Sequence, residues 1–157
     1  MNDEATWLGR AVELALETEA EGNLPIGAVL LLDGRVIAEG RNACLVPGYD
    51  PGRHAEVEAV RAVPRELWPR ARDMTCVSTL EPCVMCMGTL LLHGVRRVAF
   101  GARDPDGGAG AVLAHLPPFY PPHHLAWIGP LDPARCDPLF ARAKARFATL
   151  PAGRTGG

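Results

Sequence analysis

Two short motifs, separated by a strand-like segment, constrain this chain more than any other feature. The first is His54-Ala55-Glu56, and the second is Pro82-Cys83-Val84-Met85-Cys86. Each stands at the expected start of a helix, and residues 74–80 between them predict a buried strand. A fold that brings both helix starts to one face of a sheet would place one imidazole and two thiols side by side.

Such a residue set is typical of a zinc site. Imidazole and thiolate are ligands that Zn²⁺ prefers, and three protein ligands leave a fourth position open for water. Cys83 and Cys86 are three residues apart at a helix start, so both sulfurs can face one ion, and the positive helix end favours thiolate. Glu56 is not needed as a ligand, so its carboxylate is free to move protons. A purely structural zinc site or an accidental thiol pair is the competing interpretation, and only Glu56 argues against it.

The composition is that of a single globular domain. The 157 residues are 48% hydrophobic and 22% charged, which excludes a disordered or fibrous chain. A formal net charge of -2 argues against an indiscriminate nucleic-acid binder. The five cysteines and the absence of an export signal predict reduced thiols in the cytoplasm. No apolar run approaches the ~18 residues of a membrane span, so no membrane association is expected.

Hydrophobic periodicity and turn residues predict helices that alternate with strands. The expected elements are a helix at 5–21, a hairpin at 26–39, a helix at 54–63, a strand at 74–80, a helix at 82–93, strands at 95–101 and 125–128, and a helix at 138–149. Helices between strands predict an α/β fold, and the hairpin makes its sheet mixed. Residues 1–150 are expected to form one domain, followed by a disordered tail at 151–157.

The two motifs and their neighbouring segments resemble the cytidine-deaminase-like superfamily, whose zinc nucleobase deaminases carry His-x-Glu followed by Pro-Cys-x-x-Cys. Within it, residues from about 24 to 113 are similar to the tRNA adenosine deaminase family. The segments that carry this likeness are Leu24-Pro25-Ile26-Gly27-Ala28-Val29, Asp50-Pro51, Thr79-Leu80-Glu81 before the second motif, and Phe100-Gly101-Ala102-Arg103-Asp104. The resemblance implies the cytidine-deaminase-like fold, a three-layer α/β/α sandwich around a five-stranded mixed sheet, and a homodimer.

The resemblance also implies roles for individual residues. His54, Cys83 and Cys86 would hold one Zn²⁺ per chain, and Glu56 would shuttle protons in a hydrolytic deamination that releases ammonia without an organic cofactor. Substrate contacts are implied for three further residues, Asn42, Ala55 and Asp104. Taken alone, Asn42 could be a turn residue after a strand, and Asp104 could be a turn or helix-cap residue before Pro105.

The resemblance favours adenosine in tRNA as the substrate, with inosine as the product. A free base or nucleoside of the guanine, adenine or cytosine type is the alternative, because the segment Tyr120-Pro121-Pro122-His123-His124 departs from the tRNA enzymes. A catalytically silent zinc-binding partner subunit is a third interpretation, against which Glu56 argues.

Residues outside the two motifs are candidates for contacts with the rest of a nucleic acid. Phosphates could be bound by Arg103 and by the last helix, which carries Arg142, Lys144 and Arg146. Phe119 and Tyr120 could stack on a base, whereas Trp127 lies in an apolar strand and is expected to pack in the core.

Overall fold

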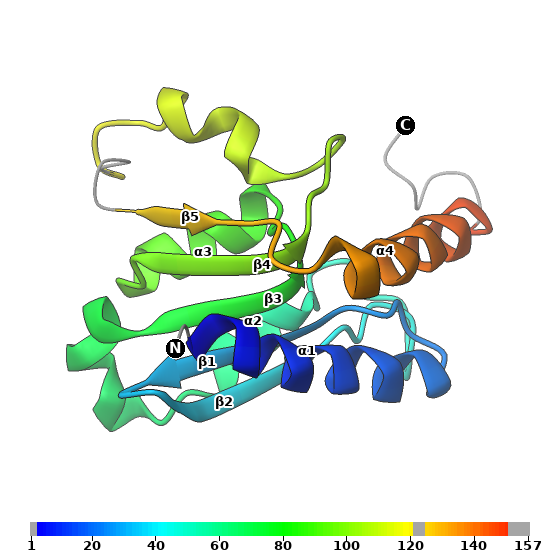
Figure 1. Ribbon diagram of the computed structural model, residues 1–157, viewed down its shortest axis with the longest axis horizontal. Helices are drawn as coiled ribbons and strands as arrows, with labels where there is room; N and C mark the ends of the chain where they lie inside the picture. Colours follow the sequence, from blue (N-terminus) through cyan, green and yellow to red (C-terminus); the bar gives the residue numbers. More distant parts are fainter. Residues whose placement is uncertain (1–2, 121–124, 151–157) are drawn as a thin grey trace.

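The structure, a computed structural model, describes residues 3–120 and 125–150. The expected disordered tail at 151–157 and residues 121–124 of the divergent segment therefore lie outside the described residues. Within the described ranges, five strands form one sheet in the order β2-β1-β3-β4-β5 (Figure 1). The strands are β1 (Gly27–Leu32), β2 (Arg35–Arg41), β3 (Thr75–Leu80), β4 (Arg97–Ala102) and β5 (Ala126–Ile128). β1 is antiparallel to β2 and β3, while β3, β4 and β5 are parallel, so the sheet is mixed as predicted.

Helices cover both faces of this sheet. α1 (Asp3–Ala20) and α4 (Pro133–Ala148) pack on one face, and α2 (Ala55–Ala62) and α3 (Val84–His93) pack on the other (Figure 1). Two 3₁₀ segments complete the described elements, η1 (Arg65–Asp73) and η2 (Ala109–His115). The expected three-layer α/β/α sandwich is therefore confirmed.

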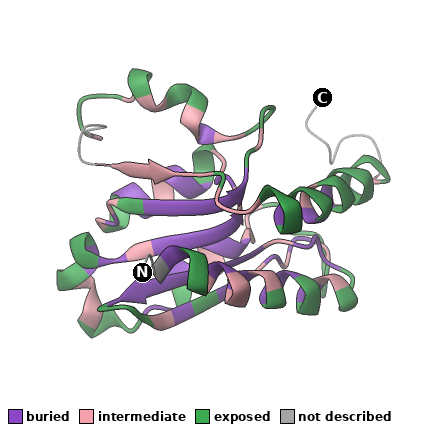
Figure 2. Cartoon of the chain, viewed as in Figure 1, coloured by how far each residue is buried: buried purple, intermediate pink, exposed green. Residues whose placement is uncertain are grey.

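The central strands are buried on both faces, which explains their continuous apolar runs. In β1, Ala28 and Leu30 pack toward α2 and α3, while Val29 and Leu31 pack toward α1. Figure 2 shows the same division, with buried strands in the middle and exposed residues on the outer sides of the helices. Two hydrophobic clusters, one on each side of the sheet, thus fix the positions of the helix ends.

Some boundaries differ from those the sequence predicts. The last helix begins at Pro133 and not at 138, because the Asp132 carboxylate caps it by accepting the Arg135 backbone N–H at 3.1 Å. α3 begins at Val84, so Cys83 is its N-cap and Pro82 precedes the helix. The hairpin turn at Asp33-Gly34 is as expected, with φ of 53° and 70°.

None of the helices in the described ranges is both long and apolar enough to cross a membrane.

Candidate metal centre and active site

The three predicted metal ligands meet where two helices begin. His54 is the N-cap residue of α2, Cys83 is the N-cap residue of α3, and Cys86 lies in the first turn of α3. The His54 Nδ1 atom lies 3.5 Å from the Cys83 Sγ and 3.4 Å from the Cys86 Sγ, and the two Sγ atoms are 3.7 Å apart. All five cysteines are free, so this cluster is not a disulfide.

This triangle has the dimensions of a tetrahedral zinc site. Typical Zn–S and Zn–N bonds of about 2.3 and 2.05 Å, at the tetrahedral angle, separate two sulfurs by about 3.8 Å and a sulfur and a nitrogen by about 3.5 Å. The three observed separations, 3.7, 3.5 and 3.4 Å, agree with these values. The group is positioned to bind one metal ion, and its one nitrogen and two sulfurs are a donor set that Zn²⁺ prefers.

Electrostatics at the cluster favour thiolate on Cys83. A hydrogen bond from Cys86, followed by one from His54, lowers the pKa of Cys83 to about 4. The same contact with Cys83 raises the pKa of His54, which favours the imidazolium that faces the thiolate. The pKa of Cys86 is raised, because Cys86 donates to Cys83 and is buried near Glu56.

Glu56 lies beside the cluster, as the sequence predicts for a group that is not a ligand. Its Oε2 atom lies 3.2 Å from the Cys86 Sγ, and the residue is only 3% exposed. The other carboxylate oxygen, Oε1, accepts a hydrogen bond from the Ser78 hydroxyl at 2.6 Å. Ser78 has no place in the two motifs, and the only sequence signal for it is a hydroxyl inside a buried strand.

A recess next to the ligands shares His54, Leu80 and Asp104 with the lining of a larger groove. The recess has a volume of about 90 Å³, and its lining includes Ala55, Glu56 and Asp104. The groove has a volume of about 880 Å³, which is within the range of about 300–1,000 Å³ that is usual for small-molecule sites. Asn42 and Asp104 line the groove, together with one side of α4. The residues implied as substrate contacts are thus brought to the same place.

Two of these residues also hold their own loops. The Asn42 side-chain carbonyl accepts the backbone N–H of Cys44 at 3.2 Å and that of Leu24 at 3.4 Å. The Asp104 Oδ1 atom accepts the backbone N–H groups of Asp106 and Gly107, both at 3.0 Å. One oxygen of Asp104 therefore holds the turn, as the turn interpretation predicts. Asp104 also lines the groove, a position that is compatible with a substrate contact.

Glu81, which precedes the second motif, is a buried carboxylate that organises the groove. Its oxygens accept the backbone N–H of Asp104 at 3.0 Å, that of Gly110 at 3.2 Å and the Trp127 indole N–H at 3.0 Å. A side chain at Gly108 or Gly110 would collide with this carboxylate, so the close approach of the backbone to Glu81 requires glycine at both positions. Glu81 thereby ties the loop of Asp104 to the strand that leads to Cys83.

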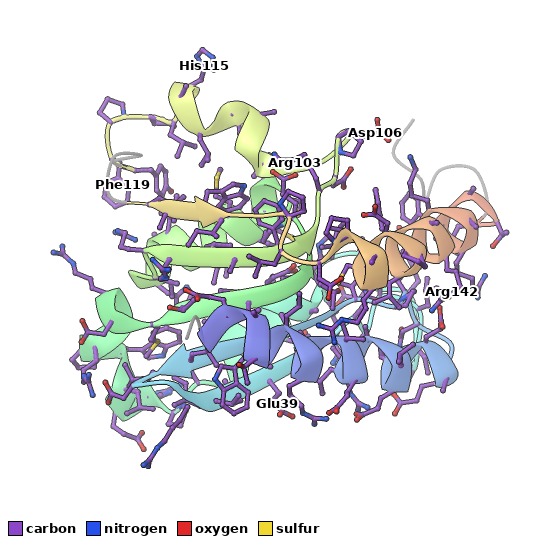
Figure 3. All side chains as sticks on the ribbon, in the orientation of Figure 1. Glu39, Arg103, Asp106, His115, Phe119 and Arg142 are labelled. Atoms are coloured by element: carbon purple, nitrogen blue, oxygen red, sulfur yellow. The ribbon has the colours of Figure 1, made fainter. Side chains whose placement is uncertain are left out.

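The aromatic residues at the groove are not those that the sequence suggests for base stacking. Phe140 and Phe147, seven residues apart on α4, line the groove. Phe119 lies near the start of β5, at the end of the sheet away from Asp106 and α4 (Figure 3). Trp127 packs against Phe100 at a ring separation of 5.7 Å, as expected for a core residue.

The expected phosphate-binding residues of α4 already have partners within the chain. Arg142 forms an ion pair with Glu19 of α1 at 2.9 Å, and Lys144 forms one with Asp106 at 2.8 Å across the groove. Arg103, labelled with Asp106 and Arg142 in Figure 3, donates to the Gly129 carbonyl at 3.0 Å. A phosphate would have to compete with these groups.

Comparisons with known proteins agree with this geometry. The family model for the cytidine and deoxycytidylate deaminase zinc-binding region matches residues 1–102. A tRNA-specific adenosine deaminase of Haemophilus influenzae is 40% identical over 116 residues, which are 73% of this chain and 66% of that protein. This chain therefore spans slightly less than two thirds of that relative's length.

Solved structures give the same picture. A structure from a study of A-to-I editing by tRNA:A34 deaminases is 33% identical with a TM-score of 0.67, covering 79% of this chain and 97% of that one. Guanine deaminase from Bacillus subtilis is 36% identical with a TM-score of 0.58, covering 73% and 71%. The family model ends at residue 102, beyond both metal-binding motifs. With its fold, its His54, Cys83 and Cys86 cluster and this match, the chain belongs to the family that shares the cytidine and deoxycytidylate deaminase zinc-binding region.

Proposed function

We propose that this protein is a zinc-dependent hydrolytic deaminase of an aminated nucleobase. The observation that carries the proposal is the Glu56 carboxylate, whose Oε2 lies 3.2 Å from the sulfur of the metal ligand Cys86. A structural zinc site or a silent zinc-binding subunit does not need a buried carboxylate at this point. The recess that Glu56 lines also shares residues with a groove of a suitable size for a nucleobase or nucleoside.

The chain's residues account for the proton transfers of the reaction. Zn²⁺, when bound, supplies the Lewis-acid chemistry that makes water a nucleophile near neutral pH. Glu56 takes a proton from the attacking water and delivers it to the ring nitrogen next to the carbon that bears the amine. The water oxygen forms a new bond to that carbon. Glu56 then takes the second proton of the water from the new hydroxyl group and passes it to the amino group, so that the carbon–nitrogen bond breaks and ammonia leaves. The net change is replacement of the amino group by oxygen.

Three residues orient the base in this scheme. Ala55 is the first residue of α2, so its backbone N–H has no acceptor within the helix and can bind an acceptor atom of the base. Asn42 and Asp104 line the groove; the Asn42 amide donates one N–H to the Cys44 sulfur at 3.4 Å and would offer the second to the nucleoside, and the Asp104 carboxylate would accept from it. These contacts would hold the amine-bearing carbon toward Glu56.

Adenosine in tRNA is the substrate that we favour, and a cytoplasmic location is part of this proposal. The named relative and the tRNA:A34 deaminase study support this choice. The similarity to a guanine deaminase supports a free base or nucleoside as the second candidate. The charge at the groove also supports the second candidate, because Asp104 and Asp106 outnumber Lys144 there, which disfavours phosphates.

The salt dependence of binding is expected to separate the two substrates. Binding of tRNA should weaken steeply with salt, by a log–log slope of roughly 0.7 per neutralised phosphate, whereas a free base should bind almost independently of salt. The experiment measures ammonia release and binding for a panel of free bases, nucleosides and an arginine-anticodon tRNA, at several salt concentrations.

Variants of α4 test the phosphate contacts directly. Replacing Arg142, Lys144 and Arg146 by alanine should weaken tRNA binding and reduce the salt slope, while zinc content stays constant. Arg135 lies at the other end of α4 in an ion pair with Asp132, so Arg135→Ala is the matched control. Efficient turnover of a free base, with no tRNA binding and no inosine formed at low salt, would replace the tRNA assignment by the second candidate.

We also propose that two copies of the chain pair through the outer face of α3. This face exposes Val84 and Leu92, which are 57% and 63% exposed, together with Met85. A two-fold axis would place the same apolar patch on both sides, so the patch needs no other complementary surface. Because α3 also carries Cys86, such a dimer would support the helix that holds the metal.

The expected result is a dimer in sedimentation equilibrium that Leu92→Glu converts to a monomer. Leu16 on α1 is 47% exposed, so Leu16→Glu is the matched control and should remain dimeric. A wild-type monomer, or an equal effect of both variants, would contradict the proposed interface.

A further inference from the structure

Ser78 is a fully buried polar residue in the middle of the sheet. It lies in β3 between Ala28 of β1 and Phe100 of β4, and its exposure is 0%. Cys76, which shares its face of the strand, packs in the hydrophobic cluster under α2 and α3. A hydroxyl in such surroundings is unfavourable unless it makes a hydrogen bond, so its partner indicates why it is there.

That partner is the carboxylate proposed to move protons. The Ser78 Oγ donates to the Glu56 Oε1 at 2.6 Å, across 22 residues of sequence. The second oxygen of the same carboxylate, Oε2, faces the Cys86 sulfur at 3.2 Å. Ser78 therefore engages the oxygen on the side of the sheet and leaves the oxygen on the side of the metal ligands for chemistry.

Ser78 lies on a rigid element of the fold. β3 is the central strand and is hydrogen-bonded to a neighbour on each side, so the Ser78 backbone has little freedom. Glu56 is the second residue of α2, and its side chain has several rotatable bonds. Without an anchor, the carboxylate could turn away from the recess, and small misplacements of a catalytic group are costly in rate.

We propose that Ser78 is a positioning residue, which acts by holding the Glu56 carboxylate in the orientation needed for proton transfer. This inference rests on the proposed role of Glu56 and extends it to a residue outside both motifs. The alternative is a buried hydroxyl that is satisfied by Glu56 but does not affect the reaction. The two interpretations predict different values of kcat for a variant that lacks only the hydroxyl group.

The test compares Ser78→Thr with Ser78→Val. The two new side chains have nearly the same shape, but threonine carries a hydroxyl group where valine carries a methyl group. Any overpacking by the added methyl is common to both, so it cancels in their ratio. With the best substrate of the panel, kcat of Ser78→Val should be about 10- to 100-fold below that of Ser78→Thr. KM and zinc content should be similar for the two, whereas the melting temperature of Ser78→Val should be lower, because the buried carboxylate loses a hydrogen bond. Ser78→Ala, which cannot overpack, should show the same loss relative to the wild type and keeps the test valid if the valine variant does not fold.

An infrared measurement reports on the hydrogen bond without relying on turnover. The Glu56 carboxylate band, identified as the band missing from Glu56→Gln, should shift in Ser78→Val and Ser78→Ala and stay near the wild-type position in Ser78→Thr. An unshifted band in all three variants would show that Ser78 does not hold Glu56.

A double variant separates failure of this inference from failure of the proposed function. Glu56→Ala with Ser78→Ala should be no slower than Glu56→Ala alone, because Ser78 acts only through the carboxylate. If Glu56→Ala is inactive but Ser78→Thr and Ser78→Val have equal kcat, the positioning role is wrong and the proposed function stands. If Glu56→Ala keeps full activity, the proposed function itself is wrong.

Discussion

Replacing Glu56 by alanine is expected to reduce kcat by about 10⁴-fold or more while zinc and fold are retained. General acid–base catalysis typically contributes about 10²–10⁴-fold, and here one carboxylate serves several successive proton transfers. Zinc should stay, because His54, Cys83 and Cys86 form the ligand triangle without Glu56. Ammonia release measures the rate, and elemental analysis measures about one zinc per chain in both proteins.

Glu58 provides the matched control for this prediction. It is two residues further along α2, it is a partly buried carboxylate, and it forms an ion pair with Arg53 at 3.0 Å. Glu58→Ala should therefore keep a rate close to that of the wild type. Loss of zinc from Glu56→Ala would mean that Glu56 is a ligand and that the proposed proton transfers are wrong.

The metal centre could be predicted from the sequence because its ligands stand in two motifs, each with a local signal, that resemble those of the zinc nucleobase deaminases. Cys83 and Cys86 are brought together by one helical turn, and His54 needs only a helix start on the same face of the sheet. The strands could be predicted for a similar reason. β1 is a continuous apolar run that ends in a turn with positive φ at Asp33 and Gly34, so its boundary is encoded at the turn itself.

The contacts of the supporting residues could not be predicted, because no motif marks them and their partners are distant in sequence. Ser78 meets Glu56 across 22 residues, and Glu81 meets Trp127 across 46. A single sequence gives no sign of which strand positions face which helix positions. Glu81 in particular reads only as part of a motif, although three N–H groups converge on it and fix the loop of Asp104.

The sequence predicts α4, but neither where it starts nor which of its residues line the groove. Pro138 suggests a helix start, but Asp132 caps the helix six residues earlier, and Pro138 lies inside it. The aromatic residues that reach the groove, Phe140 and Phe147, lie on this helix, and their place depends on how α4 packs on the sheet. Tertiary packing of the helix, and not its local pattern, therefore decides which aromatic groups meet the substrate.

Removal of the metal is expected to abolish activity and to destabilise the fold. The ligands stand at the starts of α2 and α3, so a bound ion would join two helices that are distant in sequence. An ion that binds only the folded state adds about 4 kcal/mol when it is present at 1,000 times its Kd. For a domain of this size that corresponds to a loss of about 8–16 °C in Tm after chelation. Differential scanning calorimetry with and without a chelator measures it, and added zinc should restore both Tm and rate.

The variant that isolates the ligand set is Cys83→Ala, because Cys83 is partly exposed and its loss creates little cavity. It should lose most zinc, and cobalt added to it should lack the thiolate charge-transfer absorption of the wild type. Cys136 is buried on α4, within the cluster on the opposite face of the sheet, so Cys136→Ala controls for the loss of a thiol. That variant should keep one zinc per chain and its rate, even if the cavity lowers Tm. A chelated protein that still releases ammonia, or a Cys83→Ala variant with full zinc, would overturn the assignment of this cluster as the catalytic metal site.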